Sequence, residues 1–164
     1  MNSITAIPTE IIPNEDFVYR NIHVMQSRKW VNYRRPNETD FSLKSGEEGL
    51  SVNWDKYCTL VGIFVLLGLQ KLKDGINYRN PRDFKVMKFN VGEIRDIKLV
   101  NNEIVDIIHK PELNNKAHAE ICCEDHDEIR LKLCDLIEKS ETHLIIPDFD
   151  EVFKEIDKIK KDIK

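Results

Sequence analysis

The residue types best suited to chemistry lie at 117–123, which read Ala-His-Ala-Glu-Ile-Cys-Cys. A His-x-Glu pair begins the site of zinc nucleobase deaminases, where the histidine binds the metal and the glutamate moves protons. Those enzymes take two more ligands from a downstream Pro-Cys-x-x-Cys, and no Cys-x-x-Cys follows Glu120. A site built from His118, His126 and the cysteine pair is also disfavoured, because adjacent residues of an extended chain point to opposite faces. The sequence therefore predicts no metal site.

If residues 117–123 form a strand, the same residues suggest a different function. In an extended chain His118 and Glu120 share one face with Cys122, and the small or apolar residues between them share the other. A carboxylate beside an imidazole suits general acid–base catalysis or the binding of a polar ligand. His118 and Glu120 are therefore the candidate catalytic residues. The alternative is the solvated face of an ordinary edge strand.

A second cluster combines cations with aromatic side chains. Residues 28–35 read Arg-Lys-Trp-Val-Asn-Tyr-Arg-Arg, and Trp30, Tyr33, Arg34 and Arg35 are its candidate ligand-binding residues. Such a cluster can bind a protein partner, a small anion or a nucleic acid, and it can also be a plain solvated loop. The net charge of −4 favours a protein partner or a small anionic ligand and argues against nucleic acid.

Two more candidate ligand-binding residues, Arg20 and Ser51, lie on predicted strands. Residues 17–24 have the aromatic and β-branched content of a strand. Arg20 shares a face of that strand with apolar side chains, where its charge needs a partner. Ser51 lies in a short predicted strand at 49–53.

The rest of the pattern predicts the elements that position these residues. Residues 54–73 are apolar on nearly all sides and predict a central helix capped by Asn53 or Asp55, with a buried strand at 59–67 as the alternative. The alternation at 84–91 predicts a strand that slips at a bulge.

Two further strands, at 104–109 and 117–123, and two C-terminal helices complete the pattern. The last helix begins at Asp148 in an Asp-x-x-Glu capping arrangement. The predicted fold class is α+β: a small, mainly antiparallel sheet with one central apolar helix and two C-terminal helices.

Length and composition predict one domain over residues 1–164, with 1–15 as a loose N-terminal arm and 147–164 as a terminal amphipathic helix. The apolar run at 58–69 is too short to span a membrane, so no membrane partner is expected. Four cysteines without a disulfide spacing, and a start without a signal peptide, predict a cytoplasmic protein.

Four short pieces resemble a family of small, poorly characterised bacterial proteins with the layout YRxI…F…LSV…NxAHA. They are Tyr19-Arg20-Asn21-Ile22-His23, Phe41, Leu50-Ser51-Val52 and Asn115-Lys116-Ala117-His118-Ala119. The resemblance spans about residues 17–123, and the chain departs from it at Lys116, where the family tends to have proline. This resemblance implies the order of these short segments along the chain, and it implies no biochemical mechanism.

The order of Arg20, Ser51, a helix and Glu120 is similar to that of ADP-ribosyltransferase-like domains. That resemblance implies that the arginine and serine hold NAD and that the glutamate activates the attacked group. The chain lacks the Ser-Thr-Ser and Glu-x-Glu motifs of those domains and is short for the complete fold.

Together these features favour a cytosolic accessory or interaction module that binds a protein partner or a polar ligand through the 20–51 region without a cofactor. We expect such a module to come from a compact bacterial operon of the toxin–antitoxin or defence type. The alternative is an ADP-ribosyltransferase-like enzyme that uses NAD, with Arg20, Ser51 and His118 or Glu120 in one cleft. Nucleic-acid binding through 28–35 ranks below both, and the sequence predicts no oligomeric state.

Overall fold

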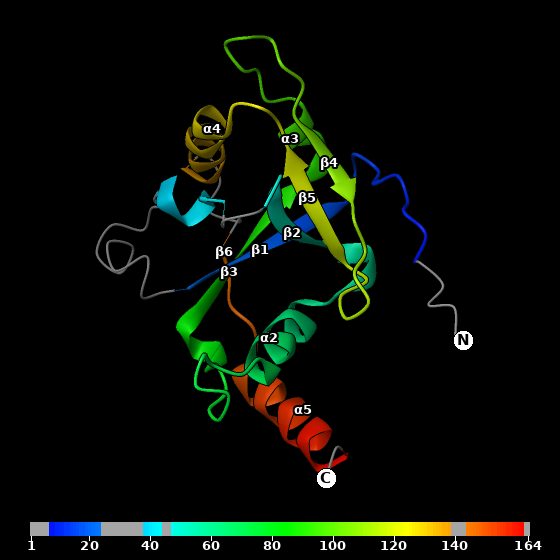
Figure 1. Cartoon of the computed structure of the whole chain (residues 1–164), viewed down its shortest axis with the longest axis vertical. Coiled ribbons are helices and arrows are strands. Elements are labelled where there is room, and N and C mark those ends of the chain that lie inside the picture. The colour runs from blue at the N-terminus through cyan, green and yellow to red at the C-terminus, as the bar shows by residue number, and fades with distance from the viewer. Residues whose placement is uncertain (1–6, 24–37, 44–46, 139–143, 163–164) are drawn as a thin grey trace.

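The computed structural model describes residues 7–23, 38–43, 47–138 and 144–162 (Figure 1). Its centre is a six-stranded antiparallel sheet with the order β4-β5-β2-β1-β3-β6. The strands are β1 (Phe17–His23), β2 (Leu50–Trp54), β3 (Phe84–Asn90), β4 (Asp106–His109), β5 (His118–Cys122) and β6 (Leu144–Ile145). The helices are α2 (Leu60–Leu69), α3 (Val91–Arg95), α4 (His126–Glu138) and α5 (Phe149–Asp162), with 3-10 turns η1 (Glu38–Phe41), η2 (Asp55–Tyr57) and η3 (Pro81–Asp83). The predicted α+β class with two C-terminal helices is confirmed.

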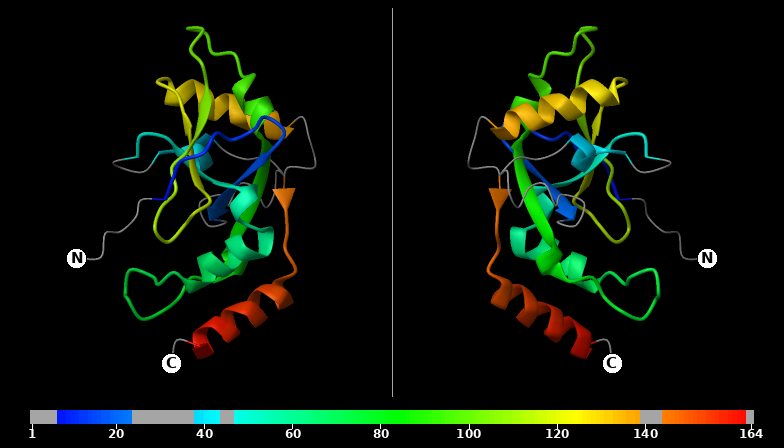
Figure 2. Two further views of the ribbon diagram at one scale, coloured as in Figure 1. Left: turned by 90° about the vertical axis from the view of Figure 1, so that its right-hand side faces the viewer. Right: turned by 90° about the vertical axis from the view of Figure 1, so that its left-hand side faces the viewer.

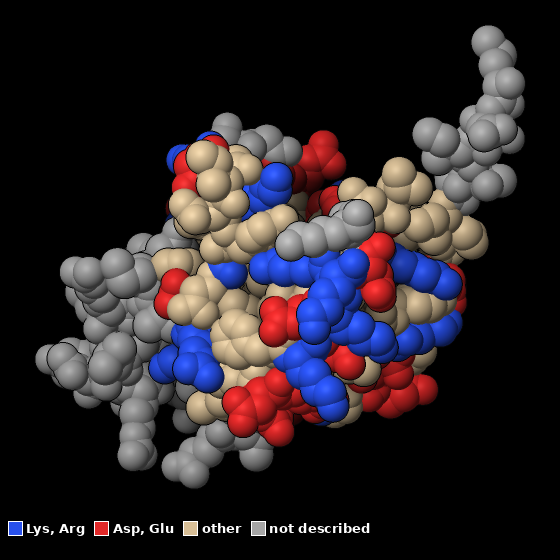
Figure 3. All heavy atoms as spheres, turned by 90° about the horizontal axis from the view of Figure 1, so that it is seen from below, with Lys and Arg blue, Asp and Glu red and all other residues tan. Residues whose placement is uncertain are grey.

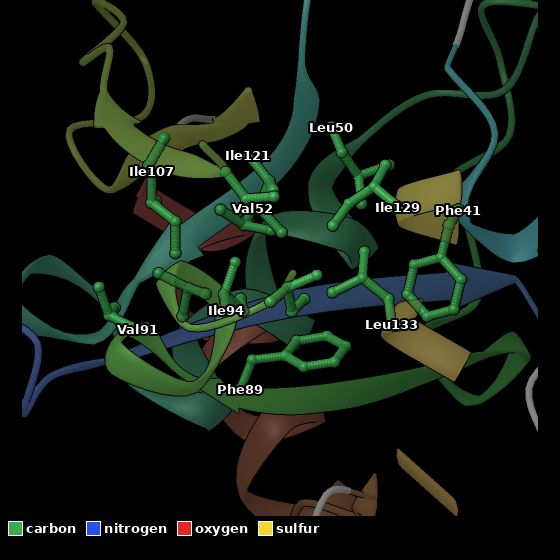
Figure 4. Close-up of a cluster of buried hydrophobic side chains, with 14 of the residues drawn as sticks. Phe41, Leu50, Val52, Phe89, Val91, Ile94, Ile107, Ile121, Ile129 and Leu133 are labelled. Carbon is green, nitrogen blue, oxygen red and sulfur yellow. The ribbon is translucent and has the colours of Figure 1, made fainter. Parts of the chain in front are cut away.

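One face of the sheet packs against α3, α4 and η1. Within each strand, the residues of this cluster lie two or four positions apart, so they point to the same side of the sheet. Figure 4 shows the cluster, in which Phe41 from η1 and Leu133 from α4 lie against strand side chains. The labelled members are Phe41, Leu50, Val52, Phe89, Val91, Ile94, Ile107, Ile121, Ile129 and Leu133.

The opposite face is covered by α2 and α5, but only at its β1–β3 side. Phe84 and Val86 of β3, with Tyr19 of β1, pack against apolar residues of these two helices. Figure 2 shows α4 and the α2–α5 pair at opposite ends of the molecule, with the sheet between them. Because both faces of β3 are covered, Val86 and Met87 are both buried although they are adjacent.

This double coverage corrects the predicted bulge in β3. The strand pairs with β1 residue for residue, from Phe17↔Asn90 to His23↔Phe84, without a slip. The broken alternation in the sequence arises because a strand buried on both faces has no polar side.

The central helix is shorter than predicted and begins at a different cap. Trp54 still belongs to β2, and α2 runs only from Leu60 to Leu69. The Thr59 side chain accepts a hydrogen bond from the Gly62 N–H and caps the helix, so neither of the predicted caps is used. Cys58 and Thr59 have extended backbone between η2 and α2, and an N-cap residue has such non-helical backbone directly before the helix.

The N-terminal arm lacks regular secondary structure over its described residues, 7–15, but it is not loose. Ile12 is only 1 % exposed and belongs to the main core. The Arg95 Nη1 atom donates to the Ile12 carbonyl over 2.7 Å, and the Glu10 N–H donates to the His109 ring. Apolar burial and two long-range hydrogen bonds therefore hold this part of the arm on the sheet.

The α2–α5 contact depends on Gly68. A Cβ atom at this position would lie 2.4 Å from Ile156 Cδ1 and 2.8 Å from Pro81 Cγ. Gly68→Val should therefore lower the free energy of unfolding by about 2 kcal/mol through overpacking, measured by urea denaturation. Leu66→Ala on the exposed side of the same helix is the control and should change it by less than about 0.5 kcal/mol. Equal losses in the two variants would contradict the packing role of Gly68.

Candidate functional site

The β2–β5–β4 side of the second face is where functional side chains gather. The apolar cluster under α2 and α5 includes no described residue of β2, β4 or β5. Ser51, Asn53, His118 and Glu120 lie on this uncovered part, because β2 pairs with β5 in the register Ser51↔Glu120 and Asn53↔His118. The prediction that His118 and Glu120 share a face opposite the buried alanines is confirmed by the burial pattern of β5. The strand is not at the edge, since β4 pairs beyond it.

His118 is held in one orientation. Its Nδ1 lies 2.8 Å from the Lys110 carbonyl oxygen, and its Nε2 lies 3.4 Å from Ser51 Oγ. A carbonyl oxygen only accepts, so Nδ1 carries a proton and Nε2 faces the serine hydroxyl. The Ser51 hydroxyl also lies 3.4 Å from Glu47 Oε1, which makes Ser51 the link between an imidazole and a carboxylate.

Glu120 pairs with Lys110 and not with its strand neighbour His118. The Lys110 Nζ atom lies 2.5 Å from Glu120 Oε2 and 3.8 Å from Glu48 Oε2. The hydrogen bond from Lys110 to Glu120 raises the pKa of the lysine and outweighs the opposing effect of burial. Gly49 permits this arrangement, because a Cβ there would lie 2.9 Å from Glu120 Cβ.

The site is partly enclosed and rich in carboxylates. Only 13 % of the His118 side chain and 13 % of the Glu120 side chain are exposed. Three carboxylates besides Glu120 lie near these side chains. Glu47 contacts Ser51, Glu48 lies near Lys110, and Glu112 lies 3.8 Å from His118 Nδ1. Among the described contacts of the site, Lys110 supplies the positive charge. Such a surface attracts a cationic or hydroxyl-bearing ligand more strongly than an anionic one.

Arg20 is near this site but does not belong to it, which corrects the predicted single cleft. In β1 it lies on the side of Val18 and Ile22, which pack in the main core, and Ser51 points to the other side. Its Nη1 atom donates to the Ser51 carbonyl over 2.7 Å, and Nε and Nη2 donate to the Asp40 carbonyl. Burial lowers the pKa of Arg20 to about 10, although Glu47 and Asp40 oppose this, so the side chain stays charged at neutral pH.

Replacement of Arg20 should destabilise the fold. Arg20→Met leaves the carbonyls of Ser51 and Asp40 without their donors in the interior, and we expect a loss of about 3 kcal/mol in the free energy of unfolding. Urea denaturation measures this loss. Lys98→Met, at an exposed cation, is the matched control and should change stability by less than about 0.5 kcal/mol. An unchanged Arg20→Met protein would show that the buried hydrogen bonds contribute nothing.

The predicted cation and aromatic cluster is not part of the described structure. Trp30, Tyr33, Arg34 and Arg35 all lie outside the described residues. Their proposed role in ligand binding therefore stays a prediction from sequence.

The Cys58 thiol is unreactive in the folded state. Burial raises its pKa to about 12, and Sγ donates to the Trp54 carbonyl. A raised thiol pKa keeps the folded state protonated while the unfolded chain ionises, so stability should fall as pH rises from about 9 towards 12. Alkylation by iodoacetamide, followed by peptide mass spectrometry, should modify Cys58 only under denaturing conditions. Rapid modification of folded protein at pH 8 would contradict this.

Sequence reasoning missed the residues that surround the Ser51–His118 contact. Lys110 and Glu112 lie in the connection between β4 and β5, and Glu47 precedes β2, so neither periodicity nor a motif marks them. Only the pairing of β2 with β5 brings them to one place.

No protein-family model matches this chain, and no match was found among curated proteins or solved structures. The two resemblances noted from the sequence therefore stay predictions. Within the described ranges, no three His, Cys, Asp or Glu side chains are grouped so that they could hold a metal ion. No helix in the described part of the chain has the length and apolar character needed to cross a membrane.

Proposed function

We propose that this chain is a binding module whose ligand presents an amine or guanidinium group to the Ser51–His118 site. The ligand is either a basic segment of a protein partner or a small polar molecule with the same chemistry. This narrows the predicted 20–51 binding region to Ser51 and the carboxylates near it. The observation that carries the proposal is the fixed His118 ring beside Ser51 on a part of the sheet that α2 and α5 leave uncovered.

The chemistry of the site supports this choice of ligand. With the proton of His118 on Nδ1, its Nε2 atom can accept, as the carboxylates of Glu47 and Glu112 do, and Ser51 can donate or accept. An amine or guanidinium supplies the donors that these acceptors require, and it forms charge-assisted hydrogen bonds with the carboxylates. An anion would have to approach against the same carboxylates.

Thermal denaturation with a panel of ligands tests the proposal. The panel comprises spermine, glucosamine and an arginine-rich peptide as cationic probes, and NAD and ATP as anionic ones. A cationic probe at 100 times its dissociation constant should stabilise the protein by about 2.7 kcal/mol and raise Tm by several degrees. The peptide and the small amines distinguish a protein partner from a small molecule.

Matched variants locate the binding. Ser51→Ala and His118→Gln should remove at least about 1 kcal/mol of this stabilisation, because each removes one polar contact. His126→Gln makes the same change at a histidine beside the start of α4 and should keep the full shift. A shift that survives in both site variants, or a shift only with NAD or ATP, would contradict the proposal.

A second candidate is general acid–base catalysis by His118, favoured by the contact between Nε2 and the Ser51 hydroxyl. It predicts labelling of Ser51 by a fluorophosphonate probe, and this labelling should be lost in His118→Gln. Absence of labelling at high probe concentration would leave the binding module as the sole candidate. We do not propose NAD as its cofactor, since the arginine that would hold a phosphate donates to backbone carbonyls on the other side of β1.

A further inference from the structure

One end of the molecule combines free lysines with exposed apolar side chains. The hairpin at 71–78, closed by the Lys71↔Tyr78 bridge, packs against α5. At this end Ile76 is 78 % exposed, and Leu72 and Tyr78 are also exposed. Residues 71–83 carry four cations and two carboxylates, a net of +2: Lys71, Lys73, Arg79 and Arg82 against Asp74 and Asp83. We name residues 71–83, together with Lys160 of α5, the basic end.

Two lysines of the basic end lie over the ring of Tyr78, and none of its three lysines has a described ion pair. Tyr78 holds Lys160 at 4.0 Å and Lys71 at 6.0 Å from its ring centroid. In the described residues, neither of these lysines, nor Lys73, forms an ion pair. The Asp74 carboxylate accepts hydrogen bonds from the Ile76 and Asn77 N–H groups within the hairpin turn. Figure 3 shows cations gathered over this end, with carboxylates between them.

The opposite end has the complementary composition. Residues 124–128 carry four carboxylates and no lysine or arginine. Residues 124–127 line a hollow of about 460 Å³ with Asn101. The loop that contains Asn101 presents Val100, 89 % exposed, and Ile104, 81 % exposed. The loop is tied to this segment because the Val100 N–H donates to Glu128 and the Asp125 N–H donates to Glu103. We name residues 100–104 and 124–128 the acidic end.

We propose that these two ends bind each other between copies of this chain, head to tail. Figure 1 shows the 71–78 hairpin with α5 at the lower end of the long axis and the loop before β4 at the upper end, so one copy cannot close the contact on itself. The basic end offers apolar side chains among cations, and the acidic end offers apolar side chains among carboxylates around a hollow. A contact between two different patches of identical chains adds further copies and does not stop at a two-fold dimer.

A second copy fits the basic end better than a nucleic acid or a bilayer does. A phosphate backbone offers no apolar surface for Ile76 and Leu72. Two lysines already lie near the Tyr78 ring, which leaves less room for a stacked base. The carboxylates interleaved with the cations would repel any uniformly negative surface. A folded protein surface can match both signs of charge.

Sedimentation velocity of the full chain tests the proposal with two neutralising variants. Lys73→Gln with Ile76→Asn disables the basic end, and Ile104→Asn with Glu124→Gln disables the acidic end. The wild-type chain should form dimers and higher species with rising concentration between about 10 µM and about 1 mM, the range of small interfaces. Association should weaken by about tenfold between 0.1 M and 1 M salt.

The mixing experiment decides between head-to-tail and other contacts. Each variant alone should stay monomeric, and the equimolar mixture should form a one-to-one dimer and nothing larger, because only one intact pair of ends remains. Leu113→Asn, at an exposed apolar residue away from both ends, should associate like the wild type. A monomeric wild-type chain at about 1 mM and 0.1 M salt would overturn the proposal. So would variants that dimerise alone or a mixture that stays monomeric. None of these substitutions touches Ser51 or His118, so the outcome is independent of ligand binding at that site.

Discussion

The centre of the structure depends on the hydrogen bonds that the buried guanidinium of Arg20 donates to two backbone carbonyls. The ladder between β1 and β2 pairs Val18 with Trp54 and Tyr19 with Asn53. Beyond these pairs, Arg20 donates to the Ser51 carbonyl and to the Asp40 carbonyl, and so replaces ladder hydrogen bonds with side-chain ones. One cation thereby joins β1, β2 and η1 at a place where unpaired carbonyls would be costly.

The same interaction separates structural from chemical roles across the sheet. Arg20 points to the α4 side of the sheet and binds the Ser51 carbonyl there. The side chains of β2 alternate between the two faces, so the Ser51 hydroxyl lies on the other side, where it contacts His118. The backbone of Ser51 is therefore held from one face while its side chain stays available on the other. A strand within a sheet holds a polar contact more precisely than a surface loop does, because the hydrogen-bonded backbone of the strand fixes the position of its side chains.

Local patterns in the sequence predicted the faces of a strand and the capping residue of a helix. They missed the contacts that arise when distant strands pair. The alternation of β5 gave the faces of His118 and Glu120, and Asp148 does accept from the Asp150 and Glu151 N–H groups at the start of α5. The predicted ends of α2 were wrong because apolar or aromatic residues lie just outside it, Trp54, Tyr57 and Cys58 before the helix and Leu72 after it, and periodicity cannot separate them from the helix. The partners of Ser51 and the position of Arg20 depend on contacts between residues distant in the chain, which no single stretch records.

The distribution of charged residues along the sequence also differs from their distribution in the folded molecule. Residues 124–164 hold 13 acidic and 8 basic residues, a net of −5, so the C-terminal quarter is acidic as a segment. In the fold its two parts separate: 124–128 lie at one end of the molecule, and α5 brings Lys160 to the hairpin at the other. The acidic C-terminal quarter therefore contributes carboxylates at one end of the molecule and Lys160 at the other. In the proposed head-to-tail contact, the local charges of the 71–83 and 124–128 segments are complementary, and such complementarity steers two approaching surfaces into one orientation.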